Sequence, residues 1–348
     1  MTSTADNTVL APRRISAPVH AARVLKGFLR RRNIMLVFSV VILLVITGTG
    51  ILAPLISPYD PTIGSLKDQK LPPAWIGERT TTKIVVDFGQ SPDQISISKA
   101  QRLKADVALG DQIEVVIRGG GSTKFLLGTD HLGRDMLSRI IHGARISLIL
   151  AGITLGVGGF IGTSLGLAAG YFGGWVDELV MRIVDIFLAL PLVLVALVLV
   201  VALGASFSLI VFVLVLFIWV RFARQVRGEV LMIKTMDYVS LAKISGASTP
   251  RVLFIHLLPG VVNTLIVVAT LQVSIVILAE STLSFLGAGV PPPTPAWGSM
   301  VANGRDVLKD AWWISTMPGV AILLTVMSLN LFGDWLRDTL DPRLRQQE

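Results

Sequence analysis

The chain has 348 residues, of which 52% are hydrophobic and only 16% are charged, and its mean hydropathy is +0.70. That balance is too apolar for an ordinary soluble domain and indicates several membrane spans. The formal net charge is +8, yet it gives little support to nucleic-acid binding because the basic residues follow membrane topology. The chain contains no cysteine, which excludes disulfides and cysteine-ligated metals.

The N-terminal 33 residues are strongly basic, with seven Arg or Lys side chains opposed only by Asp6. A basic segment beside a membrane span marks the cytoplasmic side, so we expect a cytoplasmic N-terminus. Residues 15–32 predict an amphipathic elbow helix on the inner membrane surface, with a disordered basic tail as the alternative. The apolar run that follows is too long, and starts too deep, for a cleaved signal peptide.

Six apolar runs are long enough to cross a bilayer. They are residues 34–56, 146–170, 183–203, 208–226, 260–282 and 314–336. An even number of spans returns the C-terminal tail, 337–348, to the cytoplasm, together with a link over 171–182 and a loop over 227–259. The sequence therefore predicts an all-α membrane protein with six transmembrane helices, of which the last five form a core over 146–336.

Two spans carry local signals. In the second span, glycines recur every four residues, which lets another helix backbone approach closely, either within this subunit or from a second membrane subunit. These glycines are Gly158, Gly162, Gly166 and Gly170. In the third span, Pro191 predicts a kink because proline removes a backbone donor. Arg182 and Asp185, three residues apart, are expected to pair on one face of that span.

The segment 57–145 between the first two spans is extracytoplasmic in this topology. Its middle contains three runs with the alternation typical of strands, followed by a glycine-rich link. The runs are 83–88, 94–98 and 111–118. We therefore expect a small β-rich insertion at about 76–123.

The loop over 227–259 contains a short amphipathic helix. Asp237 is expected to cap it, Gly246 to end it in the left-handed conformation, and Thr249 with Pro250 to start the next helix. Pro259 then marks the start of the fifth span. Positions i, i+3, i+4 and i+7 form one face of the short helix: Tyr238, Leu241, Ala242 and Ser245. Such a face suits a groove on another protein, and a helix resting on the membrane is the alternative.

This segment resembles the EAA loop of permease subunits of binding-protein-dependent ABC importers. The residues that keep the spacing are Ser240, Leu241, Ala242, Gly246, His256, Leu258 and Pro259. Ser240 replaces the family's glutamate, Leu241 an alanine and His256 an isoleucine. The histidine before Leu-Leu-Pro is similar to the peptide-transporting branch, of the DppC/OppC type. Further stretches over 128–148, 280–298 and 330–342 look like the same branch, so the resemblance covers roughly 33–60 and 125–345.

The resemblance implies the type I ABC importer permease fold, in the bacterial inner (plasma) membrane. The implied partners are a second permease subunit of the DppB/OppB type, one or two ATP-binding subunits, an extracytoplasmic substrate-binding protein, a dipeptide or oligopeptide and membrane lipids. No nucleic acid and no cofactor is expected. The chain has no Gly-x-x-x-x-Gly-Lys-Ser/Thr phosphate loop, so ATP hydrolysis is assigned to separate subunits and the chain is not an enzyme. The resemblance does not explain the insertion, which could contact the binding protein or cap the permease.

Polar residues in the fifth span are candidates for the translocation path, because ionisable and polar groups inside a span are often functional. Gln272 and Ser274 lie deep in the span. Glu280 lies near its outer end, where bonding to the following turn is the alternative. The histidines lack metal-ligand spacing, so no metal site is expected. Trp312 and Trp313 are typical of an aromatic anchor at the membrane interface.

Three other functions remain open at this point. A cargo such as a nickel chelate, haem or another peptide-sized solute fits the same architecture. A secondary transporter would need inverted repeats and buried ion-coupling residues, and neither is clear. A membrane scaffold or receptor would use the β-rich insertion but would leave the organised loop unexplained.

Overall fold

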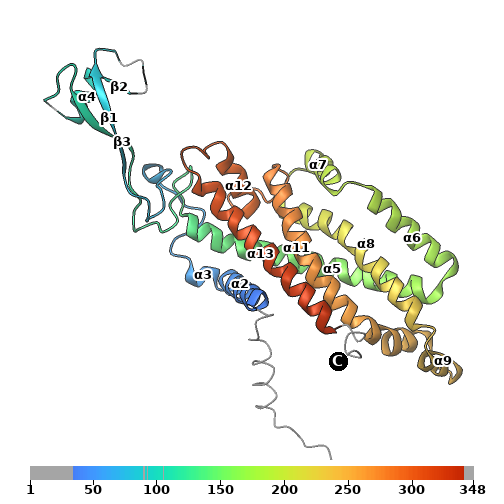
Figure 1. The fold of residues 1–348 in the computed structure, drawn as a ribbon. Helices are drawn as coiled ribbons and strands as arrows, with labels where there is room; N and C mark the ends of the chain where they lie inside the picture. Colours follow the sequence, from blue (N-terminus) through green and yellow to red (C-terminus); the bar gives the residue numbers. More distant parts are fainter. Residues whose placement is uncertain (1–33, 89–90, 92, 105, 341–348) are drawn as a thin grey trace, which may run out of the picture.

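The computed structural model describes residues 34–88, 91, 93–104 and 106–340. The predicted elbow helix over 15–32 and the last eight residues of the C-terminal tail lie outside this part of the chain. Within it, five helical segments are long and apolar enough to cross a membrane, and a bent pair of helices makes a sixth (Figure 1). The expected number of spans is therefore matched when the bent pair counts as one.

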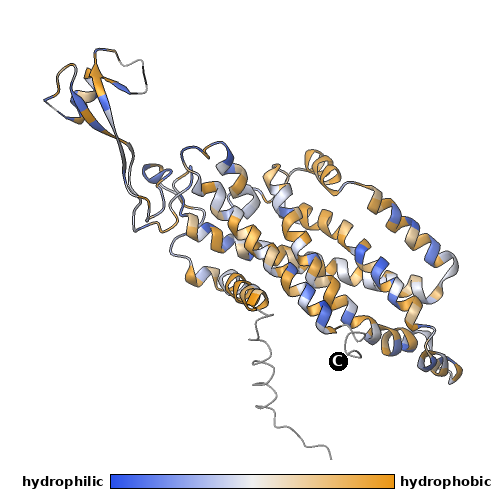
Figure 2. Cartoon of the chain, viewed as in Figure 1, coloured by the Kyte–Doolittle hydropathy of each residue, from blue (hydrophilic) through white to orange (hydrophobic). Residues whose placement is uncertain are grey.

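The spanning elements are α2 (Ile34–Ile51), α5 (Met136–Phe172), the bent pair α6 (Gly174–Ala189) and α7 (Leu192–Leu203), α8 (Phe207–Ile233), the continuous run of α10 (Thr249–Arg251), η3 (Val252–Leu257) and α11 (Leu258–Phe285), and α13 (Trp313–Leu340). Shorter elements connect them: α3 (Ala53–Ile56), η2 (Leu66–Asp68), α9 (Asp237–Ile244) and α12 (Trp297–Arg305). Hydrophobic residues predominate along the long helices (Figure 2), and many of their large apolar side chains are exposed, as a bilayer solvent allows.

Two helices extend beyond the apolar runs that predicted them. α5 begins at Met136, ten residues before the expected span, with Asp135 capping it by accepting a bond from the backbone N–H of Ser138. α8 continues to Ile233, so the first part of the expected loop 227–259 is helical. Hydropathy marks only the part of a helix that lies in hydrocarbon, and these ends carry charged residues, among them Arg139, Arg145, Arg227 and Glu229.

The third span is broken rather than merely kinked. α6 and α7 meet at an angle of 82° around Pro191. Leu190 precedes the proline and has ψ of 128°, the extended conformation that a following proline imposes. The expected pairing of Arg182 with Asp185 is wrong. Asp185 instead binds Arg224 on α8, and Arg182 lies 4.0 Å from Glu178 on its own helix.

The glycine ridge of α5 packs on α8 inside this subunit. A Cβ added at Gly162 would lie 2.2 Å from the carbonyl oxygen of Trp219, and one at Gly158 would meet the Ile218 side chain. Gly166 and Gly170 face α8 in the same way. Only glycine permits this approach, so the geometry favours internal packing over a contact with a second subunit.

Two tryptophans tie the segment before α5 and the start of α5 to the C-terminal helices. Trp313 at the start of α13 is fully buried and donates to the carbonyl oxygen of Thr129 at 3.0 Å. Trp297 in α12 donates to the carbonyl oxygen of Ile140 at 2.9 Å. The expectation that Trp313 anchors the membrane interface is therefore wrong, because its ring packs inside the protein.

The insertion is a three-stranded sheet with its own small core. β1 (Arg79–Val86) is central, parallel to β2 (Gln94–Ser96) and antiparallel to β3 (Gln112–Arg118). The core residues are Val85, Ile95, Ala100, Val107 and Ile113. The helix α4 (Ile97–Leu103) was not expected and shortens the second predicted strand. The sheet stands away from the helices at the end of an extended ribbon (Figure 1).

Candidate functional site

The candidate site for coupling to another protein is the segment between α8 and α11. It lies at one end of the helix bundle, and the β-rich insertion lies at the opposite end (Figure 1). The first part of the segment is fixed by Lys234, whose Nζ donates to the carbonyl oxygen of Gly170 at the end of α5, at 2.7 Å. The segment therefore starts from a defined point on the bundle.

The helix α9 starts at Asp237, one residue earlier than expected, because Asp237 was predicted to be the cap that precedes the helix. Met236 occupies the N-cap position and Asp237 is the first helical residue, so the expected capping by Asp237 is wrong. A carboxylate in the first turn still stabilises a helix through its dipole, by about 0.3–1 kcal/mol. Asp237 therefore keeps a favourable place without making the predicted bond.

The end of α9 is a glycine stop, as expected. Gly246 has φ of +81°, its N–H donates to the carbonyl oxygen of Lys243, and the N–H of Ala247 donates to that of Ala242, both at 3.0 Å. This pair of bonds is the Schellman motif, which satisfies the last carbonyl groups of a helix. The next helix begins one residue earlier than expected, with Ser248 rather than Thr249 at its N-cap.

One side of α9 anchors the helix to the bundle. Val239 is fully buried and belongs to a core cluster with Val230, Val252 and Leu257 from the neighbouring helices. Lys243 lies over the ring of Tyr171, 4.9 Å from its centroid. This anchor therefore joins α9 to both α8 and the run leading into α11.

The other side of α9 exposes apolar side chains. Tyr238 is 45% exposed, Leu241 62% and Ile244 84%. Ser240 is exposed and Ala242 is half-buried. Ile244 was not predicted, because the face chosen from the sequence ran through Ser245 instead. A large apolar residue two positions before the glycine that ends the helix was a usable signal. Three apolar side chains on one face of a short helix suit a hydrophobic groove.

His256 and Pro259 lie where the segment joins α11. α11 begins at Leu258 with Pro259 in its first turn, as expected for the start of the fifth span, and it continues without a break from the helix that begins at Thr249. A π-helical turn over Val252–Leu257 immediately precedes it. Such turns change the backbone bonding pattern, and a proline lacks the N–H that an α-helix would need there. His256 is half-buried and Pro259 is exposed.

The three predicted path residues on α11 are buried within the subunit. Ser274 donates to the side-chain oxygen of Asn330 on α13 at 2.7 Å. Glu280 is fully buried and accepts from the hydroxyl of Ser284 one turn later at 2.6 Å. Gln272 is 7% exposed and its side-chain oxygen has no partner in the described residues. Their bonds favour packing roles for Ser274 and Glu280, and a role in the path stays a prediction for all three.

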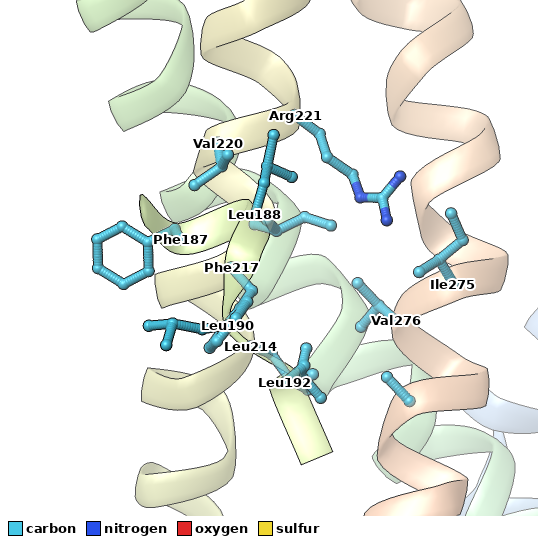
Figure 3. A pocket seen from close by; sticks show the side chains of 12 residues that line it. Phe187, Leu188, Leu190, Leu192, Leu214, Phe217, Val220, Arg221, Ile275 and Val276 are labelled. Atoms are coloured by element: carbon cyan, nitrogen blue, oxygen red, sulfur yellow. The ribbon is translucent and has the colours of Figure 1, made fainter. Parts of the chain in front are cut away.

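A cavity that the sequence did not reveal lies between α8, α11 and the break in the third span. It has a volume of about 220 Å³. Its walls are apolar apart from one side chain, Arg221 of α8, whose guanidinium points toward α11 (Figure 3). The usable signal was the single position at which an arginine, Arg221, stands inside the otherwise apolar stretch 208–223.

Buried charges lie at the other end of α5, around its first turn. Asp130 accepts a bond from Arg134 at 2.7 Å, and Arg139 lies 3.6 Å from the same oxygen. All three side chains are buried. The backbone of this segment also pairs Thr129 with Asp135. The segment therefore holds the start of α5 in one conformation.

Comparisons with known proteins agree on one family. The family described as binding-protein-dependent transport system inner membrane component matches residues 162–346, and the N-terminal transmembrane domain of oligopeptide transport permease C matches residues 29–73. The dipeptide transport system permease protein DppC of Haemophilus influenzae is 35% identical over 319 residues, which cover 92% of this chain and 94% of that protein.

Two further relatives are similar over a shorter part. The di/tripeptide transport system permease protein DppC of Pseudomonas aeruginosa is 42% identical over 65% of this chain and 75% of its own length. The glutathione transport system permease protein GsiD of Pectobacterium atrosepticum has the same identity and coverage. A solved structure of the MetNI methionine ABC transporter superposes loosely, with a TM-score of 0.48 and 18% identity, over 59% of this chain and 98% of that chain.

Proposed function

Because the chain belongs to the family of binding-protein-dependent transport system inner membrane components, we propose that it forms half of the translocation path of an ATP-driven peptide importer. Membership makes it a multi-pass permease with the type I ABC importer fold, which works with an ATPase and a substrate-binding protein. Its relatives are permease subunits and not enzymes.

The proposed cargo is a dipeptide or a short oligopeptide. Three similar permeases carry names that specify dipeptides, di- and tripeptides, and glutathione, which is itself a tripeptide. A binding protein that delivers the cargo would set much of the selectivity, so identifying that protein distinguishes a peptide from a nickel chelate or haem.

The proposed assembly contains a second, DppB/OppB-like permease subunit and two ATP-binding subunits in a bacterial plasma membrane. Both termini and the loop around α9 lie in the cytoplasm in this topology, and the β-rich insertion lies outside. The basic N-terminal segment and the opposite positions of α9 and the insertion support that orientation.

The observation that carries the coupling role is the combination of an exposed apolar face and a buried anchor on one short helix. Tyr238, Leu241 and Ile244 would enter a groove on an ATPase subunit, while Val239 links α9 to the spans. Closing of the ATPase pair on ATP would pull α9 and rock the spans toward the outside-open state. Nucleotide shifts this equilibrium only through its different affinities for the two states.

The change Leu241→Asp tests the docking role. It places a charge in the proposed groove without touching the buried anchor, so the ATPase subunits should be lost from the complex purified in detergent. Leu308→Asp is the control, because Leu308 is comparably exposed on the connection between α12 and α13. Quantitative mass spectrometry of the purified complex gives the subunit ratios. Unchanged ATPase recovery with Leu241→Asp would refute docking through this face.

A further inference from the structure

Three arginines recur at intervals of three along α8, and two of them are paired with acids on α6. Arg227 donates to both carboxylate oxygens of Asp177, each at 2.6 Å. Arg224 donates to Asp185. The third, Arg221, makes no hydrogen bond or ion pair with any residue that the structure describes.

The break in the third span explains the missing partner. The wall of the cavity beside Arg221 is formed by residues around the break, including Leu188 and Leu190, where a third acid would be needed. Arg221 lies inside the apolar run 208–226 of α8, five residues before its end, and its side chain is exposed in this subunit. A charged side chain inside a span is costly and normally faces a partner or a water-filled path.

The cavity gives Arg221 a defined place to act. Its guanidinium extends from α8 toward α11 near Ile275, into a space otherwise lined by Leu, Ile, Val, Phe and Ala side chains (Figure 3). An apolar pocket with one well-placed charged group is the usual construction of a small-molecule site. The cavity volume of about 220 Å³ is smaller than that of a typical small-molecule pocket. This small volume suits a site that a second subunit completes by closing the open side of the cavity.

The break in the third span lines the same cavity. α7 begins at Leu192, on the cavity wall, and the first N–H groups of any helix lack partners within it. Irregular backbone at membrane depth is tolerated where it is buried in protein or lines a cavity. The cavity thus joins a broken span to an arginine that has no partner among the described residues.

We propose that Arg221 is a specificity-determining residue that binds the carboxylate of the peptide as it passes through the membrane. This role rests on the proposed importer function. A guanidinium presents two parallel N–H groups that match a carboxylate, and a short peptide with a free C-terminus always carries one. The phosphate of an anionic lipid offers the same chemistry and is distinguished by the experiment.

The test compares two peptides in proteoliposomes that contain the whole transporter and its binding protein. One peptide is Ala-Phe with a free C-terminus, and the other is its C-terminal amide. Calorimetry first gives the affinity of the binding protein for each peptide, so that uptake is compared at equal loading. The variants are Arg221→Gln, Arg221→Lys and the control Arg224→Gln, which removes the same charge one turn away.

Arg221→Gln should slow uptake of the free acid by about 10–100-fold, the loss expected for a hydrogen bond to a charged group, and leave the amide unchanged. The acid-to-amide ratio then falls toward one. Arg221→Lys should recover part of the difference, because lysine keeps the charge but not the fork. Arg224→Gln should keep the wild-type ratio.

Equal slowing of both peptides would show a structural role for Arg221 and overturn the proposal, as would no effect on either. An effect that appears in vesicles with phosphatidylglycerol, but not in vesicles of phosphatidylcholine alone, would assign Arg221 to a lipid headgroup. Absence of ATP-dependent peptide uptake by the wild-type transporter would overturn the proposed function itself. An unaffected variant beside an active wild type would refute only the role of Arg221.

Discussion

The change Val239→Ala should loosen α9 from the bundle without unfolding the spans. Val239 is fully buried among side chains of α8 and the run that leads into α11. Removing two buried methyl groups costs roughly 1.6 kcal/mol at about 0.8 kcal/mol per group, and the cavity left behind raises the loss to about 2 kcal/mol. Local opening of α9 should therefore become about 30-fold more frequent.

Hydrogen exchange measured by mass spectrometry on the purified transporter provides the assay. Amides of α9 should exchange faster in the variant, whereas those of α8 around Ile218 should not change. Ser240→Ala is the matched control, since Ser240 is exposed on the same helix. If α9 is held less firmly, the number of ATP molecules hydrolysed per peptide imported should also rise. Faster exchange throughout the bundle, or none in α9, would refute the anchoring role of Val239.

Two further predictions concern glycines. Gly246→Ala should lower the melting temperature of the complex, because a left-handed φ of +81° costs an alanine about 1–2 kcal/mol. Gly228→Ala inside α8 is the control and should not lower it, because an added Cβ there meets nothing within 4 Å. Equal melting temperatures for the two variants would contradict this. Gly162→Leu should prevent α5 from packing on α8 and abolish recovery of the assembled transporter. Gly156→Leu should be tolerated, because a Cβ added at Gly156 meets nothing within 4 Å. Normal assembly of the Gly162→Leu variant would disprove the close contact.

Much of the architecture could be predicted because long apolar runs have few alternatives. The strands of the insertion were also evident, since their alternation places Val85 and Ile113 on one face of the sheet. The helix α4 was missed because its first residues, Ile97 and Ser98, continue the same alternation. Gly246 was predicted correctly because the local backbone conformation alone requires a glycine there.

The errors arose where tertiary partners override local rules. Arg182 and Asp185 were paired by their spacing, but α8 brings Arg224 to Asp185 from another part of the chain. Trp313 was assigned to the membrane interface by residue type, but the segment before α5 covers it. That Arg221 has no acidic partner among the residues that the structure describes could not be recognised until the arrangement of α6 against α8 was known, because a sequence does not show which acids lie opposite a given arginine.

The glycine ridge between α5 and α8 limits which parts of the permease can move. At Gly162 and Gly166 an added Cβ would meet the facing backbone, so the two helices meet there with little side-chain packing that could rearrange as they slide. Sliding would drive each glycine against a neighbouring side chain, which a close-packed interface resists. We therefore expect α5 and α8 to move as one rigid body. We also expect the hinge between the inward- and outward-facing states to lie outside this pair, and the 82° break beside Pro191 is a place where the neighbouring span can bend.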